Sequence, residues 1–93
     1  MILSFADKDT EKMFEGIAVR RIDLNLQKLA LRKLRYIDAA IQLEDLRIPP
    51  ANRLEKLRGE LEGLFSIRVN DQFRIIFRWQ NGNAYDVEFL DYH

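Results

Sequence analysis

The sequence contains no cysteine among its 93 residues, which excludes disulfides and thiolate metal sites. It has one histidine and no carboxylate cluster with metal-ligand spacing, so we expect neither a metal nor a cofactor. Glycine and proline are scarce, and no glycine-rich nucleotide loop is present. No apolar run approaches the length of a membrane span, and the opening residues are too short for a secretory signal. We therefore expect a cytoplasmic protein with no membrane association.

Charge of one sign is also lacking, because 15 basic residues balance 15 acidic ones. A composition of 47% hydrophobic and 32% charged residues is typical of a folded globular protein. The length predicts a single domain over residues 1–93. Since the overall charge gives no case for nucleic-acid binding, any such case depends on where the charges are placed.

The first half of the sequence predicts a short strand at residues 2–5, a brief helix from about Asp7 to Glu15, and a long helix at residues 22–43. Apolar residues recur along the long helix at helical spacing, namely Ile22, Leu26, Leu29, Ala30, Leu34, Ile37 and Ile41. Leu24 and Leu31 lie on a second flank, which we expect the first helix to cover. Residues 44–63 read as a polar connector with a short strand or turn near residues 54–57.

The last third predicts three antiparallel strands at residues 64–70, 73–79 and 85–89, because apolar and polar residues alternate along each one. The long helix would cover the apolar face, which gives an α+β fold with the N-terminal helices packed on one face of the sheet. Residues directly opposite one another must share a face, and this fixes the register. The expected pairs in the first hairpin are Val69 with Phe73, Ile67 with Ile75, and Phe65 with Phe77.

The second hairpin has two possible turns. A two-residue turn at Asn81 and Gly82 is attractive, but it would set Phe77 opposite Asp86 and mix the two faces. We therefore predict a three-residue loop at residues 81–83. The pairs that follow from it are Phe77 with Val87, Ile75 with Phe89, and Arg78 with Asp86.

The same registers place Arg68 directly opposite Arg74 on the polar face, where like charges repel one another. Leu90, the neighbour of Arg74 on the third strand, cannot neutralise it. Two interpretations remain open. The side chains either bend away toward water or toward Glu60 and Glu62, or they converge on an anion, most naturally a phosphate.

The sequence ends in Asp91, Tyr92 and His93, and we expect Tyr92 on the same polar face as Arg74. A tail of this kind can simply fray, yet a tyrosine can stack on a base and a histidine can transfer protons near neutral pH. Four charged residues on the connector, taken alone, are best interpreted as a solvated run, although they can border this face: Arg53, Glu55, Lys56 and Arg58. The residue types together favour acid–base chemistry on a phosphodiester, assisted by arginine.

Across essentially the whole chain, the sequence resembles the RelE superfamily of bacterial toxins, and most closely its HigB branch. The specific matches are residues 66–75 and the ending Asp91-Tyr92-His93; further matches are residues 7–12, 43–50, 52–54, 57–59 and 84–87. The resemblance implies helices packed on a twisted antiparallel sheet. It also implies a toxin that enters the ribosomal A site and cuts messenger RNA without metal. In that reaction the ribose 2′-hydroxyl attacks the adjacent phosphate and leaves a cyclic phosphate and a 5′-hydroxyl.

The resemblance further implies a role for each site residue. Arg68 and Arg74 would hold the scissile phosphate and its developing charge, and Tyr92 would stack on or orient the nucleotide. Glu55 would act as base and His93 as acid, with Asp91 nearby. Arg58 stands where many relatives have a lysine, so charge is kept there but proton transfer is not. Arg53 and Lys56 would bind RNA.

The implied partners are a helix-turn-helix antitoxin of the HigA type, the ribosome and messenger RNA, with operator DNA reached only through the antitoxin. A rival reading on the same scaffold is a non-nucleolytic protein, either a gyrase-poisoning toxin of the ParE type or an inactive co-repressor. Fold alone does not separate these readings. ParE-type proteins generally lack the arginines and the terminal tyrosine, which favours cleavage.

Overall fold

The computed structural model describes residues 1–91 and confirms the α+β class. Two α-helices precede a four-stranded sheet, and three short 3-10 helices connect the parts. The helices are α1 (Lys8–Phe14), α2 (Leu24–Ala39), η1 (Leu43–Arg47), η2 (Pro50–Asn52) and η3 (Gly59–Leu61). The strands are β1 (Glu55–Lys56), β2 (Leu64–Arg68), β3 (Phe73–Gln80) and β4 (Asn83–Asp91).

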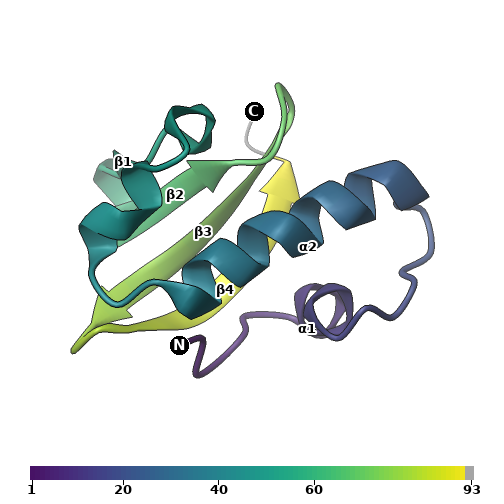
Figure 1. Ribbon diagram of the computed structural model, residues 1–93, viewed down its shortest axis with the longest axis horizontal. Coiled ribbons are helices and arrows are strands. Elements are labelled where there is room, and N and C mark those ends of the chain that lie inside the picture. The colour runs from purple at the N-terminus through teal and green to yellow at the C-terminus, as the bar shows by residue number, and fades with distance from the viewer. Residues whose placement is uncertain (92–93) are drawn as a thin grey trace.

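The strands pair antiparallel in the order β1-β2-β3-β4, and α2 lies across one face of the sheet (Figure 1). The short strand expected at residues 2–5 is present only as two isolated bridges, in which Ile2 and Phe5 pair in parallel with Ala84 and Val87 on β4. One face of the sheet is thus covered by α2, and the polar strand residues lie on the other.

The long helix is shorter than predicted at both ends. It begins after Asp23, whose carboxylate accepts a hydrogen bond from the Leu26 N–H at 3.2 Å, and it ends at Ala39. Beyond it, Asp45 accepts hydrogen bonds from the N–H groups of Ile41 and Gln42 at 2.9 and 3.0 Å. These bonds hold the backbone in a turn, so Ile41 leaves the apolar stripe and is 78% exposed. Leu24, which we expected α1 to cover, is also exposed.

The core lies between α2 and the covered face of the sheet. Ala30, Leu34 and Ile37 on the helix are completely buried. The buried strand residues that face them are Ile67, Ile75, Phe77 and Val87. The apolar face of the helix and the apolar face of the strands therefore pack against each other, as the sequence pattern predicted.

The register of the first hairpin is as predicted, with Phe65 opposite Phe77 and Ile67 opposite Ile75. The predicted loop of the second hairpin is wrong. Gln80 pairs with Asn83, which leaves a two-residue turn in which Asn81 and Gly82 both have positive φ, 52° and 77°.

A β-bulge explains how a two-residue turn is compatible with a single apolar face. Ile76 pairs with Glu88 but Arg78 pairs with Tyr85, so Phe77 faces two residues of β4, and one of them, Asp86, has a φ of 54°. The extra residue restores the alternation beyond it, and Ile75 pairs with Phe89 as predicted. Arg78 is therefore not directly opposite Asp86, although their side chains form an ion pair at 3.4 Å.

Candidate active site

Arg68 and Arg74 are direct partners across β2 and β3, as predicted. Their neighbours Ile67 and Ile75 point into the core, so both arginines project from the face that α2 does not cover. The polar face is not fully open around them, because Ser66 and Ile76 on the same face are buried. The two arginine side chains therefore project from adjacent positions on the same face of the sheet.

Arg74 is held in place by residues from three segments. Its Nε donates a hydrogen bond to Ser66 Oγ at 2.9 Å, and its Nη2 donates to the backbone oxygen of Arg53 at 2.7 Å. Nη2 also lies 3.6 Å from Glu55 Oε2. The side chain extends from β3 across β2 to β1 and is only 12% exposed. Its orientation is therefore fixed by directional contacts and not by charge alone.

Glu55 contributes a carboxylate beside this guanidinium. It pairs with Ser66 in the register of β1 and β2, which puts its side chain on the same face as Arg74. Its side chain is about half exposed, so a substrate can reach the carboxylate. A fixed guanidinium can bind a phosphate, and the accessible carboxylate beside it can accept a proton from a nearby hydroxyl.

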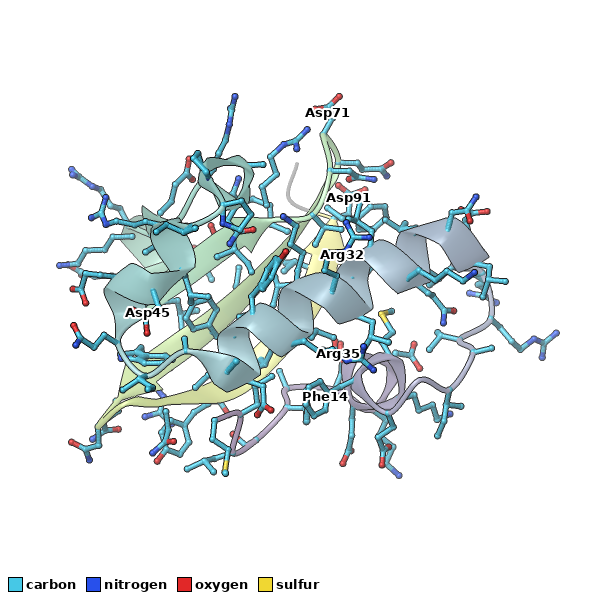
Figure 2. All side chains as sticks on the ribbon, viewed as in Figure 1. Phe14, Arg32, Arg35, Asp45, Asp71 and Asp91 are labelled. Atoms are coloured by element: carbon cyan, nitrogen blue, oxygen red, sulfur yellow. The ribbon has the colours of Figure 1, made fainter. Side chains whose placement is uncertain are left out.

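Arg68 has a different environment. Its Nη2 forms an ion pair with the Asp71 carboxylate in the β2–β3 turn, and its side chain is 30% exposed while that of Asp71 is 99% exposed. Figure 2 shows Asp71 at the tip of this hairpin. The sequence pattern had left Glu60 and Glu62 as possible partners of the two arginines. The carboxylates that pair with them in the described chain are instead Asp71 and Glu55.

The other predicted site residues are distributed unequally. Arg53 has positive φ and gives its carbonyl to Arg74, while its side chain is exposed. Arg58 is exposed at the start of η3. Lys56 pairs with Phe65, so its side chain belongs to the opposite face of the sheet from Glu55. The structure therefore does not bring Lys56 together with the two arginines.

Asp91 accepts a hydrogen bond from Gln72 Nε2 at 2.8 Å, at the same end of the sheet as Asp71 (Figure 2). Its partner across the ladder is Phe73, so its register assigns it to the face opposite Arg74. Tyr92 and His93 lie outside the described residues, and their expected places near Arg74 remain predictions.

Three polar residues of this region were not predicted from the sequence: Ser66, Asn52 and Lys33. Lys33 is 6% exposed, and burial lowers the pKa of its ammonium group, as do the charges of Arg32 and Arg68 to a lesser extent. A signal for it was available, because Lys33 occupies a position between Ala30 and Ile37 on the apolar stripe of the helix. A lysine at such a position destabilises the fold unless its ammonium group is hydrogen-bonded to a buried acceptor.

Two kinds of feature are absent from residues 1–91. No group of three or more histidine, cysteine, aspartate or glutamate side chains there is arranged to hold a metal ion. No helix in the same range is long and apolar enough to cross a membrane.

Solved structures of bacterial proteins share this fold. The chain superimposes on a protein in the "YoeB-YefM complex from Staphylococcus aureus" with a TM-score of 0.64 at 16% identity, covering 100% of this chain and 98% of that one. It also matches the crystal structure of YafQ from E. coli, with a TM-score of 0.58 at 14% identity over 98% and 93% of the two chains. At these identities the likenesses establish a shared fold.

Sequence comparisons identify the family to which the chain belongs. The chain is 46% identical to Toxin HigB-1 of Vibrio cholerae over 100% of its own length and 98% of that protein, and 33% identical to Endoribonuclease HigB of Proteus vulgaris over 100% of both. A family model described as "RelE-like toxin of type II toxin-antitoxin system HigB" matches residues 3–93. The chain belongs to this HigB-like toxin family, and its cognate partner is an antitoxin.

Proposed function

We propose that this toxin is an endoribonuclease that cuts messenger RNA in the ribosomal A site without metal. The observation that carries the proposal is the Arg74 guanidinium, fixed between Ser66 and the Arg53 carbonyl, beside the accessible carboxylate of Glu55. The name of the Proteus relative, Endoribonuclease HigB, supports RNA cleavage as the activity.

In the proposed reaction Glu55 accepts the proton of the ribose 2′-hydroxyl, whose oxygen attacks the adjacent phosphorus. The bond from phosphorus to the 5′-oxygen breaks, and His93 gives that oxygen a proton. The products are a 2′,3′-cyclic phosphate and a 5′-hydroxyl. Arg74 and Arg68 stabilise the charge that develops on the phosphate oxygens.

The remaining residues bind or orient the substrate in this proposal. Tyr92 stacks on the nucleotide, and Asp91 orients the tail. Arg58 adds a permanent positive charge and Arg53 contacts the RNA backbone, whereas Lys56 lies on the other face of β1 and has no role in this proposal. The antitoxin is a helix-turn-helix protein of the HigA type, operator DNA is reached only through it, and the toxin acts in the cytoplasm on translating ribosomes.

Mapping of RNA 5′ ends after induced expression tests the proposal. Wild-type protein should produce in-frame cuts with 5′-hydroxyl ends at translated codons. Arg74→Ala should reduce cleavage by roughly 100-fold or more, since removal of one preorganised donor typically has this effect. Arg78→Ala is the matched control, because Arg78 lies on the same strand but pairs with the exposed Asp86, and it should cut as wild type does.

The outcomes separate the rival functions. Circular dichroism must first show that both variants are folded. Intact messages accompanied by damaged DNA would indicate a gyrase poison, and normal cleavage by a folded Arg74→Ala would remove Arg74 from the reaction. Antitoxin binding with no arrest in the wild type would indicate a co-repressor.

A further inference from the structure

The connector between α2 and β1 is attached to the helix through one buried asparagine. Asn52 is completely buried and makes three side-chain hydrogen bonds. Its Oδ1 accepts from Lys33 Nζ at 2.6 Å, and its Nδ2 donates to the backbone oxygens of Leu46 and Ile48 at 3.2 and 3.4 Å. The side chain thus satisfies each of the polar groups around it and holds α2, η1 and η2 together.

The residue after Asn52 is the one that contacts Arg74. The Asn52 and Arg53 N–H groups bond to the Pro49 and Pro50 carbonyls at 2.9 and 3.0 Å, which closes the turn of η2. Arg53 then adopts a left-handed conformation with φ 46° and ψ 58°. A non-glycine residue in this region is uncommon and persists only where its surroundings fix it. This conformation presents the Arg53 carbonyl to Arg74 Nη2.

Glu55 depends on the same anchor. It begins β1 two residues after Arg53, and β1 is only two residues long, so the strand itself gives little rigidity. The Arg53 carbonyl and the Glu55 carboxylate each contact Arg74 Nη2, and the position of each depends on where the chain leaves η2.

We propose that Lys33 and Asn52 are positioning residues for Arg74, acting through the Arg53 carbonyl and the start of β1. This inference rests on the proposed function for its effect on cleavage, but not for its effect on the geometry of Arg74. Lys33 is well suited to this task because a buried ammonium with a 2.6 Å hydrogen bond has a strong preference for one acceptor position.

The first test measures Arg74 itself and needs no RNA. Nitrogen-15 NMR of the full-length protein should show slow rotation about the Cζ–Nε bond of Arg74, as expected for a guanidinium bonded at both Nε and Nη2. Lys33→Met removes the Nζ donor and keeps the apolar stem, and it should accelerate this rotation several-fold. Lys28→Met is the matched control, because Lys28 is an exposed lysine on the same helix, and it should change nothing.

The second test asks whether the effect on cleavage passes through Arg74. Under single-turnover conditions with saturating substrate, Lys33→Met should slow cleavage by about 10-fold with a much smaller change in apparent affinity, since misplacement of a catalytic group affects mainly the chemical step. In an Arg74→Lys background the same substitution should add less than about 2-fold, because the group that it positions is already lost.

Each result decides one of the two proposals. A folded Lys33→Met in which the Arg74 signals and the cleavage rate are unchanged would overturn the positioning role. Full additivity of Lys33→Met and Arg74→Lys would also overturn it and leave a purely structural role. Altered Arg74 rotation in a protein whose wild type does not cut RNA would support positioning and contradict the proposed function. If Lys33→Met does not fold, Asn52→Asp keeps the acceptor for Lys33 but loses both bonds to the Leu46 and Ile48 carbonyls, and the same criteria then apply to it.

Discussion

Arg74 and Arg68 are direct partners on neighbouring strands, yet their surroundings differ greatly. Arg74 is held by a buried hydroxyl, a backbone carbonyl and a carboxylate that come from two other strands and a turn. Arg68 pairs with the carboxylate of Asp71 at the tip of a hairpin, and the side chain of Asp71 is almost fully exposed. The same residue type at the same level of one sheet is thus rigid in one case and adaptable in the other.

The difference matters because electrostatic catalysis depends on donors that do not reorganise during the reaction. A guanidinium fixed by directional bonds keeps one orientation. A guanidinium paired with an exposed aspartate can exchange that partner for a phosphate at little cost, since exposed ion pairs contribute little free energy. In the proposed reaction we therefore expect Arg74 mainly to stabilise the transition state and Arg68 mainly to capture the substrate.

Replacing each arginine by lysine tests this assignment most strongly. Arg74→Lys keeps the charge but cannot reproduce the fork that bonds Ser66 and the Arg53 carbonyl together, so the single-turnover cleavage rate should fall by roughly 100-fold. Arg68→Lys should lower the rate by only about 5-fold and should mainly weaken binding of the RNA–ribosome complex. Equal losses of rate in the two variants would show that the two arginines act alike.

A smaller effect is expected when the partner of Arg68 is removed. Asp71→Ala frees a guanidinium that is otherwise paired, so apparent affinity for RNA should rise by about 2- to 3-fold at low salt and return to the wild-type value at high salt. The free energy of unfolding should change by less than about 0.5 kcal/mol because Asp71 is exposed. Salt titrations of binding and thermal unfolding measure the two quantities. Loss of affinity would mean that Asp71 orients Arg68 for the substrate.

The parts predicted correctly from the sequence are those set by repeating local patterns. Alternation of apolar residues fixed the pairing of Ile67 with Ile75, and that pairing alone places Arg68 opposite Arg74. The second hairpin was predicted wrongly because a turn preference and an alternation rule conflicted, and the bulge at Asp86 satisfies both.

The contacts of Arg74 could not be predicted for a different reason. A guanidinium can reach several neighbours, and its choice here depends on a backbone carbonyl presented by a left-handed residue, Arg53. No residue preference identifies that conformation, because arginine has no special tendency to adopt it. It follows from the tertiary bonds of Asn52, and only the single lysine within the apolar stripe of α2 hinted at them.

The contacts that fix Arg74 lead back through Arg53 and Asn52 toward the turn after α2. A substitution of Asp45, which holds that turn, tests whether the turn also contributes to the position of Arg74. The hydrogen bonds that the Asp45 carboxylate accepts from the backbone N–H groups of Gln42 and Ile41 lower its pKa below the ordinary value of 3.8. A carboxyl with a lowered pKa in the folded state contributes stability above its unfolded pKa, and this contribution is lost as pH falls through the folded pKa. Asp45→Asn should therefore be slightly less stable than wild type above about pH 5, and the difference should shrink toward about pH 2. Chemical unfolding across this range, followed by circular dichroism, measures it. A difference that stays constant with pH would mean that the charge of Asp45 is irrelevant to the turn. A loss of RNA cleavage in the same variant at neutral pH would extend the anchoring of Arg74 back to the end of α2.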